Sequence, residues 1–481
     1  MGNRGQGDGG RNRDDATYDL IVIGGGAAGS TVAFDAVRRG VRVALIEEWK
    51  LGGTCLNAGC DPTKTLVRTA EVLHLVRTAD RFGLQATDPG VDWPSIRARI
   101  EDVIDTIRGG DGEANVRDAG IDLYTDHARF ISERDVVVGG NILSGDRFVI
   151  ATGASTTVPE IHGIDQVGFI TNLDVPHLDA LPTSLVIVGG GPVAVEFAQI
   201  FARLDVEVTL LAARDQILSK EEPELAAALT EILKAEGIQV ETGARVSSAR
   251  RERGRKVLRW EGGDGPGSAA AEEILIATGR QPNVGKLGLD AAGVEYSDHG
   301  ITVDNAMQTS VPTIWAVGDV TGIYPFTHVA DYQARIAEHN AFTDGPVRRA
   351  DYRVVPWTTF TDPELARVGL TEAEAVAGGY AVVTATVPFE ELPRAITSDQ
   401  RLGCVELVVD RATHQILGGH ILAAQAGELI AEVALAMRHR LPVSAIPDTI
   451  HSYPTMSEGV FWTAYQLVTE KLAGLVPVAG R

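Results

Sequence analysis

Two stretches of the chain repeat the same order of apolar and small residues. Residues 19–29 read DLIVIGGGAAG and residues 184–194 read SLVIVGGGPVA. In each, an uninterrupted apolar run, typical of a strand buried on both faces, meets a glycine turn. A helical stretch follows each turn, and a second apolar run, VRVALIE or VEVTLLA, follows each helix. The pattern predicts two βαβ units, each with a glycine turn of the kind that binds a dinucleotide.

The glycine turns predict where two dinucleotides bind, because glycine lets the backbone approach a pyrophosphate at a helix N-terminus. The residues expected at the turns are Gly24, Gly26 and Gly29 in the first unit and Gly189, Gly191 and Ala194 in the second.

The two units differ at the end of their second strand. Glu47 stands there in the first unit, and a carboxylate at this point accepts bonds from a ribose 2′-hydroxyl and repels a 2′-phosphate. The same step from the second turn reaches Ala212, and Arg214 follows two residues later. We therefore expect NADPH rather than NADH at the second unit. A solvated loop residue is the alternative interpretation of Arg214.

Further apolar runs extend the pattern toward the C-terminus. FVIATGA (148–154) and ILIATGR (274–280) each predict a strand entering a tight turn, and TIWAVGDV (313–320) predicts a strand that leads to Asp319. Beyond about residue 346, CVELVVD and QILGGHIL predict strands and GELIAEVALAMRH predicts an amphipathic helix. These features indicate a separate α/β domain.

Composition narrows the class of protein. The 481 residues include 53 glycines and carry a net charge of −22, which disfavours nucleic acid or an anionic membrane as partner. No apolar run is long enough to span a membrane, and three cysteines are too few for a secreted disulfide framework. We expect a cytoplasmic enzyme with a polar, disordered tail over residues 1–17.

Two of the three cysteines lie in GGTCLNAGC, at positions 55 and 60. In a regular helix, residues five apart have Cα atoms about 8.7 Å apart, whereas a disulfide needs roughly 4.4–6.8 Å. Cys55 and Cys60 can therefore bridge only if the segment between them is not regular helix. Asp61 and Pro62 predict a helix start with Asp61 as N-cap, which places Cys60 at a helix N-terminus, where a thiolate is favoured.

Other interpretations of the cysteines are weaker. A zinc site would need more ligands than His74, the nearest histidine, and inert core cysteines would not need flanking glycines. A redox-active disulfide fits best, and no metal site is expected. Cys404 is interpreted as a small core residue.

These motifs resemble a family, the FAD-dependent pyridine nucleotide-disulfide oxidoreductases, which include dihydrolipoamide dehydrogenase, glutathione reductase and mercuric reductase. The resemblance covers nearly the whole chain after the tail. It rests on GGGAAG, GGTCLNAGC, PTK, ATG, GGGPVAVEF, ATGRQPN, AVGDV, FTDPELARVGLTE and HSYPTMSEG, which occur in the family's order.

The resemblance implies an α/β fold with two Rossmann-like dinucleotide-binding domains and a C-terminal α+β dimerisation domain. The implied FAD-binding domain comprises residues 18–155 and 281–345, the NAD(P)-binding domain 156–280 and the interface domain 346–481. It further implies a homodimer whose active sites are shared between subunits.

The resemblance also implies roles for single residues. Electrons would pass from NADPH to FAD and then to a Cys55–Cys60 disulfide, with Cys60 against the flavin and Cys55 as the interchange thiol. Lys64 would lie near the flavin and pair with Glu196, while Asp319 would lie near the ribityl chain. The remaining implied cofactor contacts are Ala27, Ala28, Gly53, Thr54, Thr152, Gly153, Gly279 and Gly318.

The sequence departs from much of the family at HSYPTMSEG. Tyr453 stands where dihydrolipoamide dehydrogenase and glutathione reductase have a histidine base, paired with the glutamate that matches Glu458. A free tyrosine has a pKa about 10, against about 6.5 for histidine, so Tyr453 is a poor base near neutral pH. His451 could substitute only if the loop turns differently.

Mercuric reductase resembles this chain at that position, because it too carries a tyrosine within a similar T-M-x-E-G run. Many mercuric reductases add a vicinal cysteine pair near the C-terminus, and the last residues here, LAGLVPVAGR, contain none. The metal-delivery route is therefore expected to be absent. Asp61 is a second departure: it acts either as a plain N-cap or as a carboxylate that raises the pKa of Cys60.

The leading interpretation is an NADPH-dependent flavoprotein reductase that acts on a disulfide, a soft metal ion or another thiol-reactive small molecule. Three alternatives stay open: a dihydrolipoamide dehydrogenase subunit of a 2-oxoacid dehydrogenase complex, a member that uses the dithiol for C–C or C–S cleavage, and a non-catalytic flavin-binding sensor.

Overall fold

The computed structural model describes residues 17–262 and 265–472. Residues 1–16 of the expected disordered tail lie outside the described residues, and Thr17, its last residue, begins a strand, β1 (Thr17–Tyr18). The chain divides into two compact units. Of the described residues, unit 1 comprises 17–57, 105–155 and 281–350, and unit 2 comprises 58–104, 156–262, 265–280 and 351–472.

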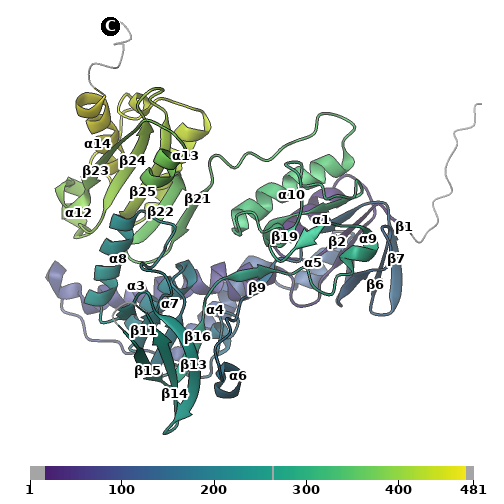
Figure 1. Ribbon diagram of the computed structural model, residues 1–481, viewed down its shortest axis with the longest axis horizontal. Coiled ribbons are helices and arrows are strands. Elements are labelled where there is room, and N and C mark those ends of the chain that lie inside the picture. Colours follow the sequence, from purple (N-terminus) through teal and green to yellow (C-terminus); the bar gives the residue numbers. More distant parts are fainter. Residues whose placement is uncertain (1–16, 263–264, 473–481) are drawn as a thin grey trace, which may run out of the picture. The chain divides into compact units, whose positions relative to one another are not determined.

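Unit 1 is built on a five-stranded parallel sheet with the strand order β20-β8-β2-β3-β4. Helix α1 (Ala27–Val37) connects β2 to β3 and packs against α10 (Thr327–Phe342) (Figure 1). The bounds of the strands are β20 (Ile314–Ala316), β8 (Phe148–Ile150), β2 (Leu20–Ile23), β3 (Val43–Ile46) and β4 (Asp122–Tyr124).

A second, mixed sheet of unit 1 has the order β1-β7-β6-β5. Phe130 on β5 and Phe148 on β8 pack with ring centroids 5.1 Å apart, so one apolar core lies between the two sheets. The other strands of this sheet are β7 (Asn141–Gly145), β6 (Asp135–Val138) and β5 (Ala128–Phe130).

Unit 2 contains the second βαβ unit in a parallel sheet of order β12-β11-β10-β16. Helix α7 (Pro192–Arg203) connects β10 to β11 and packs against α3 (Cys60–Arg77). The strands are β12 (Gln239–Glu241), β11 (Glu207–Leu211), β10 (Ser184–Val188) and β16 (Glu273–Ile276). An antiparallel sheet accompanies them, with β13 (Arg245–Glu252), β14 (Arg255–Glu261) and β15 (Gly267–Ala271).

The C-terminal part of unit 2 is a five-stranded antiparallel sheet of order β21-β22-β25-β24-β23. The predicted strands at CVELVVD and QILGGHIL and the helix at GELIAEVALAMRH are confirmed as β24, β25 and α13. The elements are β21 (Pro356–Thr359), β22 (Glu364–Gly369), β25 (Ile416–Ala423), β24 (Cys404–Asp410), β23 (Val382–Pro388), α13 (Ala426–Arg438) and α14 (Glu458–Gln466).

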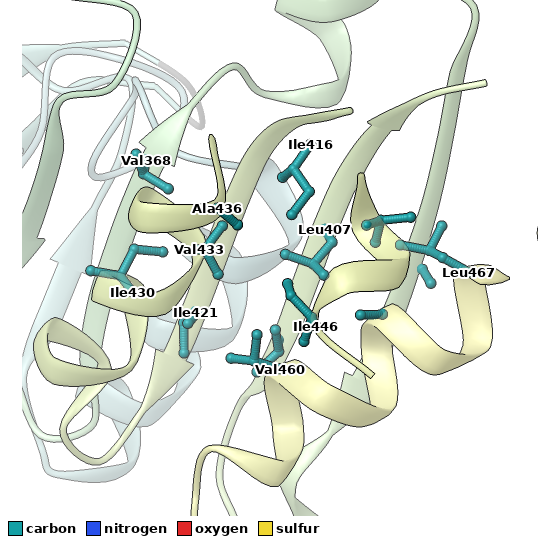
Figure 2. Packing of buried hydrophobic residues seen from close by; sticks show 14 of the residues in the cluster. Val368, Leu407, Ile416, Ile421, Ile430, Val433, Ala436, Ile446, Val460 and Leu467 are labelled. Carbon is teal, nitrogen blue, oxygen red and sulfur yellow. The ribbon is translucent and has the colours of Figure 1, made fainter. Parts of the chain in front are cut away.

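The two faces of this C-terminal sheet differ. Figure 2 shows Leu407 and Ile421 from the strands packed with Val433 from α13 and Val460 from α14. Alternate residues of these strands point to the other face, where Glu224 of α8 (Pro223–Ala235) is near Glu406. Helix α8 contacts β25, and Figure 1 shows it beside this sheet. The alternation places Cys404 and Glu406 on that second face.

Candidate active site

The first glycine turn is closed to side chains. Gly24 follows β2 with φ 103°, and a methyl group there would lie 2.3 Å from the carbonyl oxygen of Ala151. A methyl group at Gly29 would lie 1.8 Å from the carbonyl oxygen of Gly24. Strand and helix therefore approach so closely that these two positions require glycine.

Glu47, directly after β3, is fixed by the same turn. Its Oε2 accepts a hydrogen bond from the backbone N–H of Gly25 at 2.6 Å, and its Oε1 accepts one from that of Trp49 at 2.7 Å. Burial raises the pKa of Glu47, and these backbone donors oppose the rise. The carboxylate therefore stands ordered at the position where a ribose would be recognised.

The start of α1 is open on the ligand side. Within residues 17–262 and 265–472, no side chain caps the helix at Gly26, and a methyl group at Gly26 would meet only the Cα of Gly53, at 3.8 Å. Uncapped N–H groups beside open space fit a pyrophosphate, so this turn fits FAD. Ala27 and Ala28 form the first turn of α1.

The second glycine turn repeats the geometry with one difference. Gly189 has φ 142°, and a methyl group there would lie 2.2 Å from the carbonyl oxygen of Ala277. Gly191 precedes Pro192, the first residue of α7, and has no atom within 4 Å of an added methyl group among the described residues. Ala194 is fully buried, so the position that needs glycine in the first turn holds a methyl group here.

The end of β11 carries no acid. Ala212 is buried, and a methyl group at Gly190 would lie 2.8 Å from the Cβ of Ala212. Arg214 is exposed, and its carbonyl accepts a hydrogen bond from the N–H of Gly243 at 2.7 Å. The side chain of Arg214 is therefore exposed to solvent, two residues after Ala212.

The cysteine segment is a broken helix. Helix α2 (Gly53–Ala58) contains Thr54 and Cys55, Gly59 interrupts it with φ −121° and ψ −112°, and α3 then starts at Cys60. The requirement that the residues between the cysteines depart from regular helix is met. The predicted N-cap at Asp61 was wrong: Gly59 is the N-cap, and Asp61 lies in the first turn.

Cys60 is consequently the first residue of a helix of 18 residues, where the helix dipole favours a thiolate. Burial raises the pKa of Asp61, and the charge of Lys64 opposes the rise. The hypothesis that the Asp61 carboxylate raises the pKa of Cys60 stays a prediction.

Cys55 contacts a residue that the sequence analysis missed. The hydroxyl of Thr327 donates a hydrogen bond to the Sγ of Cys55 at 3.2 Å, and Thr327 is the first residue of α10. Gly53, at the start of α2, lies so close to the first turn that a methyl group on it would be 2.9 Å from the Cα of Gly26. Within unit 1, Cys55 is therefore beside the turn that fits FAD.

Lys64 and Glu196 are brought together as the resemblance implied. Their Nζ and Oε2 atoms are 2.8 Å apart, with the carboxylate buried and the ammonium group partly exposed. The other oxygen of Glu196 accepts a hydrogen bond from the N–H of Phe360 at 2.9 Å. Phe360 lies in the FTDPELARVGLTE motif, so a signal for it was present in the sequence.

The loops of the other implied cofactor residues are ordered by short polar contacts. Thr152 and Asn283 exchange two hydrogen bonds of 2.9 Å, and the N–H of Gly318 donates to Oε1 of Gln333 at 2.7 Å. Gly153, Gly279 and Gly318 have φ values of 68°, 131° and 77°, and Asp319, in the following turn, is half-buried.

The C-terminal motif leaves Tyr453 exposed at 73 % of its surface. Glu458 is buried, and its Oε2 accepts a hydrogen bond from the N–H of Thr455 at 3.2 Å. The Nε2 of His451 lies 2.9 Å from Oε1 of Glu432, and its Nδ1 lies 2.9 Å from the carbonyl oxygen of Thr449. Both ring nitrogens of His451 are thus engaged within its own chain.

Two further predictions concern metal and Cys404. Over the described ranges, no group of three or more His, Cys, Asp and Glu side chains is arranged to hold a metal ion.

Cys404 is partly exposed at the start of β24 rather than part of the core. Burial, with the carboxylates of Glu406 and Glu224, raises its pKa to about 11, so it is a poor nucleophile.

A search for membrane-spanning helices finds none of sufficient length and hydropathy in the residues that the structure describes.

Comparison with known proteins adds two family matches. Residues 18–334 match a model described as pyridine nucleotide-disulphide oxidoreductase, and residues 355–464 match the dimerisation domain of the same family.

Individual relatives agree. The mercuric reductase of Streptomyces lividans is 37% identical over 96% of this chain and 98% of its own length. The dihydrolipoyl dehydrogenase of Chlamydia muridarum is 33% identical over 92% of this chain and 95% of its own length. Among solved structures, the HOCl-induced flavoprotein disulfide reductase RclA from Escherichia coli, as its Cu(II) complex, superposes with a TM-score of 0.84 at 32% identity, covering 94% of this chain and 99% of that one.

Proposed function

Because this chain belongs to the pyridine nucleotide-disulphide oxidoreductase family, we propose that it carries electrons from NADPH through FAD to a Cys55–Cys60 disulfide and on to a thiophilic acceptor. The coarser part of this statement needs no proposal: the chain is a flavoprotein disulfide oxidoreductase with a dimerisation domain. The acceptor, the coenzyme preference and the roles of single residues are the proposed parts.

FAD would be held at the first turn by Gly24, Gly26 and Gly29, with Glu47 on the ribose. When bound, it allows two electrons to pass between a nicotinamide and a disulfide. Lys64 would hold a fixed positive charge near the flavin, and Glu196 would keep that ammonium group oriented.

NADPH would bind at the second turn through Gly189, Gly191 and the start of α7. Two features support a phosphorylated coenzyme: Ala212 cannot repel a 2′-phosphate, and Arg214 is exposed beside the turn. The first turn would not accept this coenzyme, because the ordered carboxylate of Glu47 would repel the 2′-phosphate.

The thiols of Cys60 and Cys55 would have different roles. Cys60, at the start of α3, would be the thiol nearest the flavin, and its thiolate is favoured by the helix dipole. Cys55 would be the thiol that meets the acceptor, and the hydroxyl of Thr327 can donate to its thiolate. When the dithiol reduces an acceptor, it loses two electrons and two protons and the disulfide forms again.

The observation that carries the acceptor proposal is the placement of the 451–459 motif. Tyr453 is exposed where a histidine base would be expected, Glu458 is turned to a backbone N–H, and His451 is engaged by Glu432. The one imidazole of this motif, that of His451, has both ring nitrogens engaged and so is not available to move protons between dithiols. A soft metal ion needs no such base, because it binds thiolate directly. We therefore propose Hg(II) as acceptor, with Cu(II) as the other candidate because a solved relative is a Cu(II) complex.

A homodimer is proposed from the dimerisation domain. Ile450, which is 98% exposed, Tyr453, Trp462 and Tyr465 are apolar or aromatic side chains on its surface, and covering them by a second copy would remove them from water. Sedimentation velocity would test this proposal, and a monomer at micromolar concentration would contradict it.

The acceptor is tested by anaerobic NADPH oxidation, with Hg(II) in excess low-molecular-weight thiol and with Cu(II) in the absence of added thiol, because free thiol itself reduces Cu(II). Metal-dependent oxidation is expected in the purified yellow protein and in the control Cys404→Ser, and its loss is expected in Cys55→Ser. Flavin reduction by NADPH without metal-dependent turnover would contradict the metal proposal and leave an organic acceptor.

The dihydrolipoyl dehydrogenase relatives make lipoamide the second candidate acceptor. The same assay with lipoamide separates the two. Turnover with lipoamide that exceeds turnover with the metals would favour this alternative.

A further inference from the structure

The ammonium group of Lys64 is held from two sides. Oε2 of Glu196 lies 2.8 Å from its Nζ, and the ring centroid of Phe360 lies 4.5 Å from the same atom. The second distance is within the range of a cation–π contact, in which the negative face of the ring attracts the charge. The Lys64 side chain is still 37% exposed, so an opening remains on its other sides.

Phe360 also holds the partner of Lys64. Its backbone N–H donates to Oε1 of Glu196 at 2.9 Å, so each oxygen of this buried carboxylate has one partner. Phe360 therefore contacts both charged groups. Its backbone N–H binds the carboxylate of Glu196, and its ring contacts the ammonium group of Lys64. A buried carboxylate with both oxygens engaged has little freedom to turn away.

The Phe360 backbone is itself anchored along α7. Asp362 and Gln199 exchange two hydrogen bonds of 2.8 Å between backbone and side-chain amide groups. Arg203 places Nη1 2.8 Å from Oδ2 of Asp362. Glu196, Gln199 and Arg203 are three and four residues apart and so share one face of the helix.

The contacts of the Phe360–Asp362 segment link the dimerisation domain to Lys64. Phe360 directly follows β21, an edge strand of the C-terminal sheet, and all these residues belong to unit 2. The end of β21 therefore positions the ring of Phe360 against Lys64. Lys64 lies on α3, four residues after Cys60.

We infer that Phe360 is a positioning residue that keeps the Lys64 ammonium group in place for the flavin. The inference rests on the proposed function, because it takes Lys64 to face the flavin. An ammonium group on a flexible side chain stabilises developing negative charge best when it is fixed beforehand. The ring and the N–H of Phe360 supply that fixation, and loss of the ring leaves Lys64 only its ion pair.

The test compares Phe360→Leu with Phe360→Tyr, which keeps an aromatic face. The control is Trp357→Leu, since Trp357 lies on β21 and makes a similar contact with Arg367, 4.8 Å from its ring centroid. The midpoint potential of the bound flavin is measured by equilibration with a reference dye, and the rate of flavin reduction by NADPH by stopped flow. Flavin absorbance of the purified variants reports that each has folded.

Phe360→Leu is expected to slow flavin reduction about tenfold. The same factor lowers the midpoint potential of the two-electron couple by about 30 mV. Phe360→Tyr and Trp357→Leu should stay within about twofold of the parent. Unchanged potential and rate in Phe360→Leu, or an equal drop in Trp357→Leu, would overturn the inference.

Measurements on a Lys64→Met variant distinguish failure of this inference from failure of the proposed function. Lys64→Met should lower the potential, and adding Phe360→Leu to it should have no further effect, because Phe360 acts through the lysine. If Lys64→Met leaves the potential unchanged, the proposed role of Lys64 fails. If Lys64→Met lowers it and the two effects simply add, only the inference about Phe360 fails.

Discussion

The two glycine turns have the same topology, and two of the differences between them bear on the ligand. In the first, Gly29 packs so closely that a methyl group would lie 1.8 Å from a carbonyl oxygen, whereas Ala194 carries a buried methyl group at the matching place. In the first, Glu47 is ordered by two backbone N–H groups, whereas Ala212 offers no polar atom. One topology therefore presents two different surfaces to a dinucleotide.

If NADPH binds the second turn as proposed, the choice of coenzyme is made after the turn rather than in it. Both turns leave the start of a helix open to a pyrophosphate, which every dinucleotide shares. Under the proposed function, the residue at the end of the second strand would then select by charge, since a carboxylate repels a 2′-phosphate and an alanine does not.

The largest expected effect is at the close approach in the first turn. Gly29→Ala should abolish tight FAD binding and destabilise unit 1 by about 3 kcal/mol, because the methyl group forces strand and helix apart. The reverse change, Ala194→Gly, should cost only about 1 kcal/mol through helix propensity. Flavin content after purification and thermal unfolding measure both, and a yellow, stable Gly29→Ala variant would show that the turns are equivalent.

The next effect concerns coenzyme selection at the second turn. Arg214→Ala should lower kcat/KM for NADPH about tenfold and leave that for NADH nearly unchanged, because only NADPH carries the phosphate. Ala212→Glu should reduce the preference further by repulsion. Steady-state kinetics with both coenzymes provide the check, and a parent enzyme that prefers NADH would refute the assignment.

Buried carboxylates differ between the units as well. Glu47 in unit 1 is met by backbone donors, whereas Glu406 on β24 of unit 2 is near the carboxylates of Glu222, Glu224 and Glu372. Burial, reinforced by those three charges, raises the pKa of Glu406 to about 7. The folded state therefore holds a proton that the unfolded state loses near pH 4.5, so stability is lost as the pH rises from there through about 7.

Glu406→Gln should accordingly stabilise the protein at pH 8 by about 1 kcal/mol and make little difference at pH 4. Unfolding midpoints across this pH range test the expectation. Glu47→Gln serves as the comparison and should give a smaller change with pH, since backbone donors offset its burial. A difference between Glu406→Gln and the parent that does not vary with pH would contradict the account.

A last effect, confined to one thiol, distinguishes Cys55 from Cys404. Thr327→Val should raise the pKa of Cys55 in the reduced enzyme by about 1 unit, because the thiolate loses a hydroxyl donor. Thr327→Ser should restore it. The pH dependence of alkylation by iodoacetamide, resolved by peptide mapping, reports this pKa. Cys404, with its pKa raised to about 11, should stay unreactive at neutral pH in every variant.

Local patterns predicted most of the fold. Apolar runs that end in glycine predicted β2 and β10, and the alternation in CVELVVD predicted β24, because burial and pleat are encoded within a few residues. Glu47 could be placed for the same reason, since strand and helix lengths set its distance from the turn.

Contacts between distant segments could not be predicted in this way. Thr327 meets Cys55 across 272 positions, and Phe360 meets Glu196 across 164, and no local pattern relates such residues. The start of α3 was misplaced because Asp61 and Pro62 are ordinary signals for a helix start, whereas Gly59 begins it through its own unusual backbone conformation. The Lys64–Glu196 pair was anticipated from the family resemblance alone.

The central claim is that reducing equivalents from NADPH reach the cysteine pair through the flavin. An anaerobic titration with NADPH, followed by flavin absorbance and thiol counting, tests it most directly. The account predicts that the parent takes up about twice the reducing equivalents of Cys60→Ser, because a disulfide accepts two electrons beyond the flavin. Equal uptake by the two proteins, with no new thiols in the parent, would contradict it.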